Sequence, residues 1–279
     1  MAFFSDSTVR DIVQANIEKV GELEDEQQEK LLRVFKKVRQ QLLDRLSTIP
    51  QGTFTEQQLN VTLVQISAAI EAIKRELTGE MANASEILAE KGINDLVDEV
   101  QKMTKHFEKS VQPLNLNTAL ISQESQNFLV NKHEASIAAY TEALRADITS
   151  RISQSMIARD TTQRTVDQLV AGVGRYFAGE EWRLRRIVRT ELHNIYNFAK
   201  LNSMKEAGKV VPGLKKTLVH PMDDRTGEDS KELKRENPIV DMSQPFRFKW
   251  KDTVRVFMFP PDRPNDRSIL VPVKDSWNN

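Results

Sequence analysis

Hydrophobic residues recur along most of this chain at the spacing of amphipathic helices. Within each stripe, apolar positions return every three or four residues, and the positions between them are mostly Glu, Gln, Lys and Arg. The clearest stripes cover residues 10–46, 59–77, 94–110, 118–148 and 181–200. This pattern predicts that the chain is almost entirely helical up to about residue 210.

Prolines and glycines indicate where these helices should end. Pro50 and Pro113 are the only prolines before residue 210, and each lies between two stripes. Gly79 and Gly92 flank a shorter segment, and the glycine-rich stretch at 171–180 predicts a further interruption. The stripes are incompletely apolar and show no sustained heptads, so they predict a loose bundle, or packing against another protein, rather than a long coiled coil.

The composition changes after residue 208. Eight of the ten prolines follow, and between them lie four short β-prone runs, LKKTLVH, PFRFKW, VRVFMF and SILVPV. The expected fold is mainly α, with a long helical N-terminal region at residues 1–158. A small α+β C-terminal domain with short strands is expected to follow at residues 159–279.

Charge is distributed unequally between the two halves of the chain. The formal net charge is zero, but residues 1–150 contain 16 basic and 23 acidic residues, a net of −7. Residues 151–279 contain 24 basic and 17 acidic residues, a net of +7. This asymmetry indicates two environments or two partners, and the alternative is that each half carries only its own solvated surface.

The residue inventory disfavours several classes of function. There is no cysteine, the four histidines have no metal-ligand spacing, and no apolar run approaches the ~20 residues of a membrane helix. Phosphate-loop, dinucleotide and nucleophile-elbow motifs are absent, so we expect no enzyme activity, cofactor or metal. The N-terminus lacks the features of a secretory signal, which predicts action in a cytoplasm or within a particle assembled there.

Two charged clusters are candidate binding sites. The first is a set of four arginines within two helical turns, Arg183, Arg185, Arg186 and Arg189. It can contact nucleic-acid phosphates or an acidic partner, or form a solvated face paired with nearby acids. The second is an acidic turn with Asp223, Asp224, Glu228 and Asp229. Its carboxylates suit a divalent cation, but the pattern lacks EF-hand regularity and equally fits a capped turn.

Three short motifs follow one another in a fixed order over the last 90 or so residues. The first comprises Arg189, Thr190 and Glu191, and the second comprises Asp223, Arg225 and Thr226. The third comprises Pro260, Pro261, Pro264, Asn265 and Arg267. Over roughly residues 150–279 this ordered set resembles the C-terminal domain of the Mu F-like minor head proteins of tailed phages, also called head morphogenesis proteins.

The resemblance implies a structural protein of the virion, located in the head interior or at the portal vertex, and in the host cytoplasm during assembly. It implies the portal or major capsid protein as partners, several copies per particle, no membrane, and contact with packaged or exiting double-stranded DNA. The alternative is a non-structural nucleic-acid-binding protein that acts in packaging or DNA protection. An effector module on a head-protein scaffold is a third, weaker alternative, because no unaccounted catalytic segment remains.

This chain departs from the family pattern where many relatives place Cys or His in positions that suggest a metal site. The corresponding positions here are Gly227, Ser230, Arg263, Asp266 and Ser268. Thiolate or imidazole ligation is therefore lost. We hypothesise that ion pairs, such as Arg263 or Arg267 with Asp223 or Asp229, replace the metal.

Overall fold

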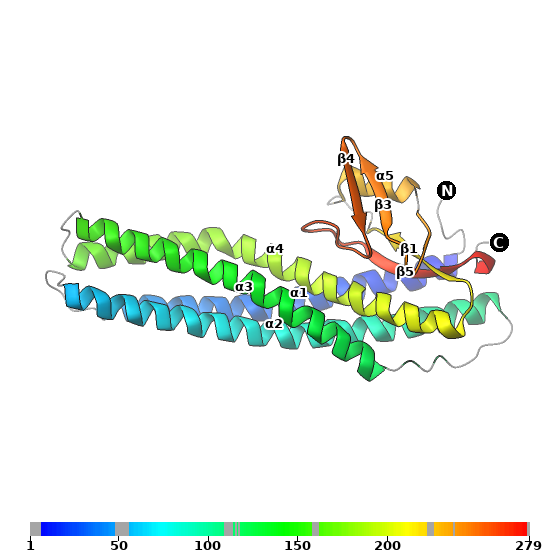
Figure 1. Cartoon of the computed structure of the whole chain (residues 1–279), viewed down its shortest axis with the longest axis horizontal. Coiled ribbons are helices and arrows are strands. Elements are labelled where there is room, and N and C mark those ends of the chain that lie inside the picture. The colour runs from blue at the N-terminus through cyan, green and yellow to red at the C-terminus, as the bar shows by residue number, and fades with distance from the viewer. Residues whose placement is uncertain are drawn as a thin grey trace. The chain divides into compact units, whose positions relative to one another are not determined.

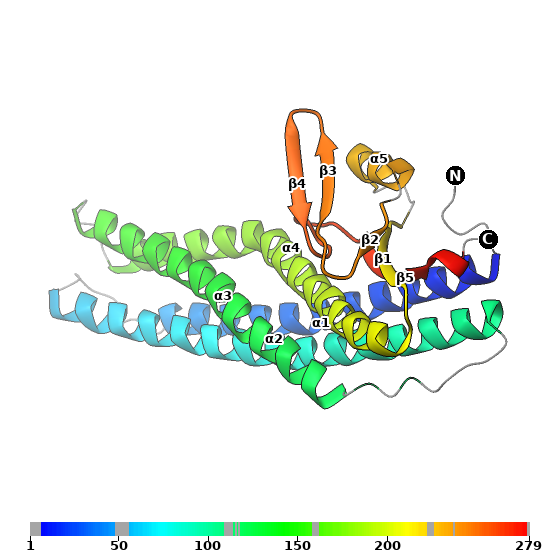
Figure 2. The ribbon, with the colours of Figure 1, turned by 45° about the vertical axis from the view of Figure 1, so that its right-hand side comes forward.

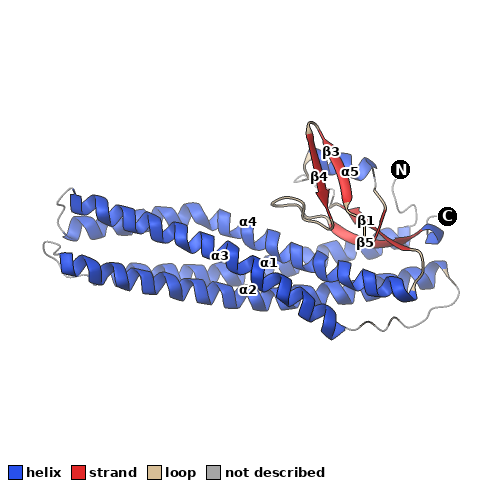
Figure 3. Cartoon of the chain, in the orientation of Figure 1, coloured by secondary structure: helices blue, strands red, loops and turns tan. Residues whose placement is uncertain are grey.

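The computed structural model describes residues 7–47, 56–108, 114, 116, 118–157, 162–221, 226–236 and 238–277. Within them, four long helices precede a segment of short strands (Figures 1 and 3). The helices are α1 (Ser7–Ser47), α2 (Glu56–Phe107), α3 (Thr118–Ile157) and α4 (Thr162–Val210). The later elements are β1 (Leu214–Val219), α5 (Glu228–Glu236), β2 (Val240–Asp241), β3 (Phe246–Trp250), β4 (Thr253–Phe257), β5 (Ile269–Lys274) and the 3₁₀ helix η1 (Asp275–Trp277).

This order confirms the predicted fold class, which was a mainly α chain with a long helical region followed by a small α+β part. All four β-prone runs form strands: β1 and β3 fall within their runs, and β4 and β5 each extend one residue beyond theirs. The expected boundary at residues 158 and 159 lies outside the described residues, as do Pro50 and Pro113. The helices nevertheless end and restart on either side of both prolines.

The chain forms two compact units, which we describe separately. The first unit comprises Met1–Glu26, Ala84–Leu129 and Arg189–Asn279, and the second comprises Gln27–Asn83 and Val130–Val188. Each of the four long helices contributes residues to both units.

The core of the second unit is built from helical stripes alone. Ile66, Ile70, Ile73 and Leu77 recur on α2 at helical spacing and are all buried. On α1, Phe35 is 1% exposed, and its ring centre lies 5.9 Å from that of Tyr140 on α3. The spacing predicted from the sequence therefore places these side chains in a common interior.

The first unit packs helices α1, α2 and α4 with all of the strands. Its core contains Leu96, Val100, Ile195, Tyr196 and Leu270. A charged pair also lies in this core: Lys200 Nζ on α4 donates to Glu99 Oε1 on α2 at 2.6 Å, and both side chains are 0% exposed. Asn16 of α1 donates to the same carboxylate oxygen at 2.9 Å, so Glu99 joins three helices.

The strands form two separate antiparallel sheets. In the three-stranded sheet, β1 lies between β2 and β5, with Leu214 opposite Lys274 and Val219 opposite Ile269. The β3–β4 hairpin forms the two-stranded sheet and extends away from β1 and β5 in Figure 2. Gly213 has a φ of 81°, a left-handed conformation that glycine adopts without steric cost where α4 turns into β1.

Two expected helix interruptions are wrong. Helix α2 continues through Gly79 and Gly92, and α4 continues through residues 171–180. A glycine inside a helix costs only about 1 kcal/mol relative to alanine, and tertiary packing of the flanking residues exceeds that cost.

Gly92 has a packing role that the sequence did not indicate. A Cβ atom at this position would lie 2.5 Å from the carbonyl oxygen of Tyr196, so α2 and α4 approach each other closely here. Gly92→Ala is expected to destabilise the protein by about 1–3 kcal/mol, because a backbone must move. Gly79→Ala is the matched control, since nothing lies within 4 Å of its Cβ position and a gain of up to about 1 kcal/mol is expected. Urea unfolding compares the two variants, and equal stabilities would contradict the close approach.

Candidate functional site

His193 of α4 is 2% exposed, and its ring contacts two other segments of the first unit. Its Nδ1 faces Glu24 Oε1 of α1 at 2.5 Å, and its Nε2 faces the carbonyl oxygen of Ser268 at 2.5 Å. A carbonyl oxygen only accepts, so Nε2 carries a hydrogen and a second proton lies between Nδ1 and Glu24. Burial acts to lower the pKa of His193, but Glu24 and the Ser268 carbonyl outweigh it and raise this pKa above 6.5.

Asn197 lies one helical turn after His193, and its side chain also bonds to the segment where β5 begins. Its Nδ2 donates to the carbonyl oxygens of His193 and Ser268, and its Oδ1 accepts from the backbone N–H of Leu270 at 2.8 Å. One buried side chain therefore satisfies backbone groups on both sides of the point where β5 begins.

Ser268, His220 and Asp266 form a buried cluster that resembles a nucleophile–base–acid set in composition only. The Ser268 hydroxyl contacts both Asp266 Oδ1 and His220 Nδ1. Burial acts to raise the pKa of Asp266. The hydrogen bonds from Ser268 and the electrostatic effect of His193 and His220 outweigh burial and lower this pKa, so the carboxylate accepts from the hydroxyl. The single hydroxyl hydrogen is then used, and His220 Nδ1 must donate to Ser268.

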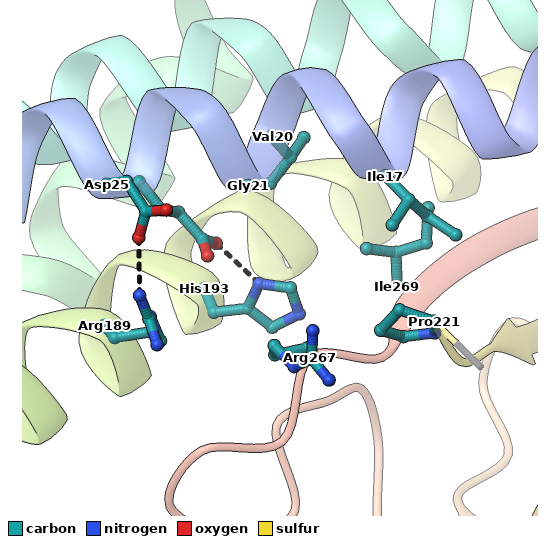
Figure 4. Close-up of a pocket in the computed structure, with 10 residues that line it drawn as sticks. Ile17, Val20, Gly21, Asp25, Arg189, His193, Pro221, Arg267 and Ile269 are labelled. Atoms are coloured by element: carbon teal, nitrogen blue, oxygen red, sulfur yellow. Dashed lines mark hydrogen bonds and ion pairs between the residues drawn. The ribbon is translucent and has the colours of Figure 1, made fainter. Parts of the chain in front are cut away.

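The first and third motifs meet around a cavity of about 70 Å³ (Figure 4). Arg189 and His193 point from α4 toward α1, where Arg189 pairs with Asp25, and Arg267 lies beside His193. Thr190, the residue after Arg189, accepts at Oγ1 from the backbone N–H of Asn265 at 3.4 Å, a long hydrogen bond. Glu191 is buried, and Pro260 and Pro261 are joined by a cis peptide bond.

A four-residue ion-pair network ties α5 and β4 to the segment before β5. Asp229 of α5 accepts from Arg255 of β4 at 2.7 Å and from Arg263 at 2.7 and 2.8 Å. Asp262 accepts from Arg255 at 2.6 Å, and Arg263 also donates to Ser230 Oγ. The hypothesised pair of Arg263 with Asp229 is therefore present, while Asp223, Asp224 and Arg225 lie outside the described residues.

This network does not fit a metal ion. Two guanidinium groups use the oxygens of Asp229 that a cation would need, and arginine is not a ligand. Among the described residues, no group of three or more His, Asp or Glu side chains is arranged to hold a metal. A polar cavity of about 210 Å³ lies beside the network, and Thr226, Asn265, Asp266 and Arg267 are among the residues that line it.

Three of the four predicted binding arginines belong to the second unit. Arg185 pairs with Glu29 of α1 at 2.5 Å and with Glu181 at 3.1 Å, and its hydrogen bond lowers the pKa of Glu29. The Arg186 guanidinium lies 4.8 Å from the ring centre of Trp182, and Arg183 is exposed. A phosphate that binds Arg185 would have to compete with these carboxylates.

Sequence analysis did not assign a role to four residues that organise the first unit, which are Glu24, His193, Asn197 and Arg255. Glu24 and His193 are 169 residues apart, and no local pattern reports such a pairing. The one available signal was the polar content of positions 191–203 on an otherwise apolar helical face, which indicates buried side chains with partners.

No helix in the described ranges has a stretch that is long and apolar enough to cross a membrane. Comparisons with protein-family models, curated proteins and solved structures return no match.

Proposed function

We propose that this chain is a minor head protein of a tailed phage, a structural component at the portal vertex that aids head morphogenesis. The observation that carries the proposal is the meeting of its motif segments within the first unit. Asn265 donates to Thr190, Arg189 and Arg267 line one cavity, and Thr226 lines the neighbouring cavity with Asn265. If the three short motifs matched by chance, their residues would have no reason to lie close together. If the chain shares the family's fold, they would.

In this proposal the long helices supply contacts to the portal or the major capsid protein. In the second unit, Val61 and Val64 are 52% and 69% exposed and lie three positions apart on α2, so they share one face. Trp182 on α4 is 59% exposed. These side chains offer apolar anchors of the kind used by helices that dock on a partner surface.

The small α+β part serves as a rigid folded core in the same proposal. The ion pairs of Asp229 with Arg255 and Arg263, and the bonds of His193 and Asn197 to Ser268, hold its segments without a metal. Several copies per particle and contact with packaged or exiting DNA complete the proposed role.

The copy number of the protein in purified, DNA-filled particles tests the proposal. Quantitative mass spectrometry of particles from the phage that encodes this chain is expected to give a small, fixed number per particle, at or below the number of portal subunits. Absence from mature particles would sink the proposal. It would leave a transient assembly factor, or the alternative of a nucleic-acid-binding protein that is not built into the particle.

A further inference from the structure

The β3–β4 hairpin is a two-stranded antiparallel ribbon with one buried face. On that face, Phe246 and Phe248 are 0% and 1% exposed, and Phe246 stands opposite Phe257. Arg255, opposite Phe248, lies over its ring at 5.3 Å and donates to Asp229 and Asp262. These contacts anchor the ribbon, so its other face is held in a fixed orientation.

The outer face of the ribbon combines two cations with two apolar side chains. Cross-strand pairs place Arg247 opposite Val256 and Lys249 opposite Val254. Val254 is 59% exposed and Val256 is 51% exposed, while Arg247 and Lys249 are exposed as well. In the part of the chain that the structure describes, neither cation pairs with a carboxylate.

The charge of the hairpin is strongly one-sided. Its twelve residues from Phe246 to Phe257 contain four basic residues and one acid, Asp252, which lies in the turn beside Lys251. Arg255 is already neutralised on the inner face by Asp229 and Asp262. The cations of the outer face and the turn therefore present positive charge that is available to a partner.

We infer that the outer face of the β3–β4 ribbon binds the phosphate backbone of double-stranded DNA. A two-stranded ribbon fits the major groove of B-form DNA, and cations that flank the groove contact phosphates without reading sequence. Val254 and Val256, on β4 opposite the two cations of β3, suit the apolar sugar and methyl surface of the groove. On α4, by contrast, Arg185 and Arg189 already pair with acids of α1.

This inference names a surface for the DNA contact that the proposed function includes, although its observations hold without that function. A chain that is absent from phage particles would still have the same ribbon. Binding to an acidic protein surface, which the same cations would also attract, is the competing outcome that the experiment must separate.

Fluorescence anisotropy of a labelled, mixed-sequence DNA duplex with the full chain tests the inference. The logarithm of the affinity should fall linearly with the logarithm of salt between about 50 and 200 mM, by roughly 0.9 for each phosphate contact. Removing two contacts in Arg247→Gln/Lys249→Gln should therefore reduce the slope by about 1.8. The variant should retain the wild-type melting temperature, because both side chains are exposed.

Lys102→Gln/Lys105→Gln is the matched control, since it removes two exposed cations from α2 of the same unit. This variant should keep the wild-type slope. The inference is overturned if the wild-type chain does not bind the duplex at the lowest salt, which would favour an acidic protein as partner. It is also overturned if Arg247→Gln/Lys249→Gln binds with an unchanged slope.

Discussion

Replacing Lys200 with Met is expected to reduce the free energy of unfolding by about 3–5 kcal/mol. Lys200 and Glu99 are 0% exposed, and the substitution leaves the Glu99 carboxylate buried with Asn16 as its remaining donor. Glu99 Oε2 already has no hydrogen-bond partner, so the carboxylate cannot compensate within the core. Burial raises the pKa of Glu99, and this effect outweighs the opposite effect of Lys200. Urea unfolding at neutral pH measures the loss.

Two further variants separate a broken charge pair from a simple packing defect. Glu99→Leu/Lys200→Met removes both charges, and it is expected to recover most of the loss because an apolar pair of similar volume can replace a buried ion pair. Lys209→Met on the same helix removes a cation that is 70% exposed and pairs with Glu206, so a change within about 0.5 kcal/mol is expected. If the double variant is less stable than Lys200→Met, the ion-pair explanation is incorrect.

The second large effect is expected at Asn197. Asn197→Ala removes the acceptor of the Leu270 N–H and the side-chain donor to the Ser268 carbonyl, all in a buried region. The Leu270 N–H is left unsatisfied, whereas the Ser268 carbonyl keeps His193 Nε2 as a donor, so a loss of about 1–3 kcal/mol is expected. Hydrogen exchange should also show faster exchange of the Leu270 amide than in the wild type.

Asn94→Ala provides the control for this measurement. Asn94 is exposed on α2, and a change within about 0.5 kcal/mol is expected there. An Asn197→Ala variant as stable as Asn94→Ala, with unchanged Leu270 exchange, would contradict the role assigned to this side chain.

Local patterns predicted the elements of this fold well. The runs PFRFKW and VRVFMF alternate between apolar and polar residues, and the structure pairs them so that Phe246 and Phe248 are buried while Arg247 and Lys249 are exposed. The helical stripes predicted the buried positions of α2 because a stripe of this kind must be covered. The pairing of Arg263 with Asp229 was expected from the departure of this chain from the family pattern.

Sequence reasoning failed where the outcome depends on which segments meet. Glycine lowers helix propensity whatever its surroundings, so Gly92 predicted a break, yet the close approach of the Tyr196 carbonyl selects glycine at that position. His193 and Glu24 lie 169 residues apart, and their shared proton is a property of the fold alone. Arg185 and Arg189 stand out as free cations in the sequence because their partners Glu29 and Asp25 lie on another helix.

The position of β5 in the sheet also constrains the order in which the parts of the protein fold during synthesis on the ribosome. Strand β1 needs β5 along one whole side, and Asn197 needs Leu270, which is synthesised 73 residues later. Until residue 274 has left the exit tunnel, a nascent chain presents β1 with that side unpaired and Asn197 without its main-chain partners in β5. The helices can form early from local contacts, so closure of the first unit is a late event that follows the synthesis of β5.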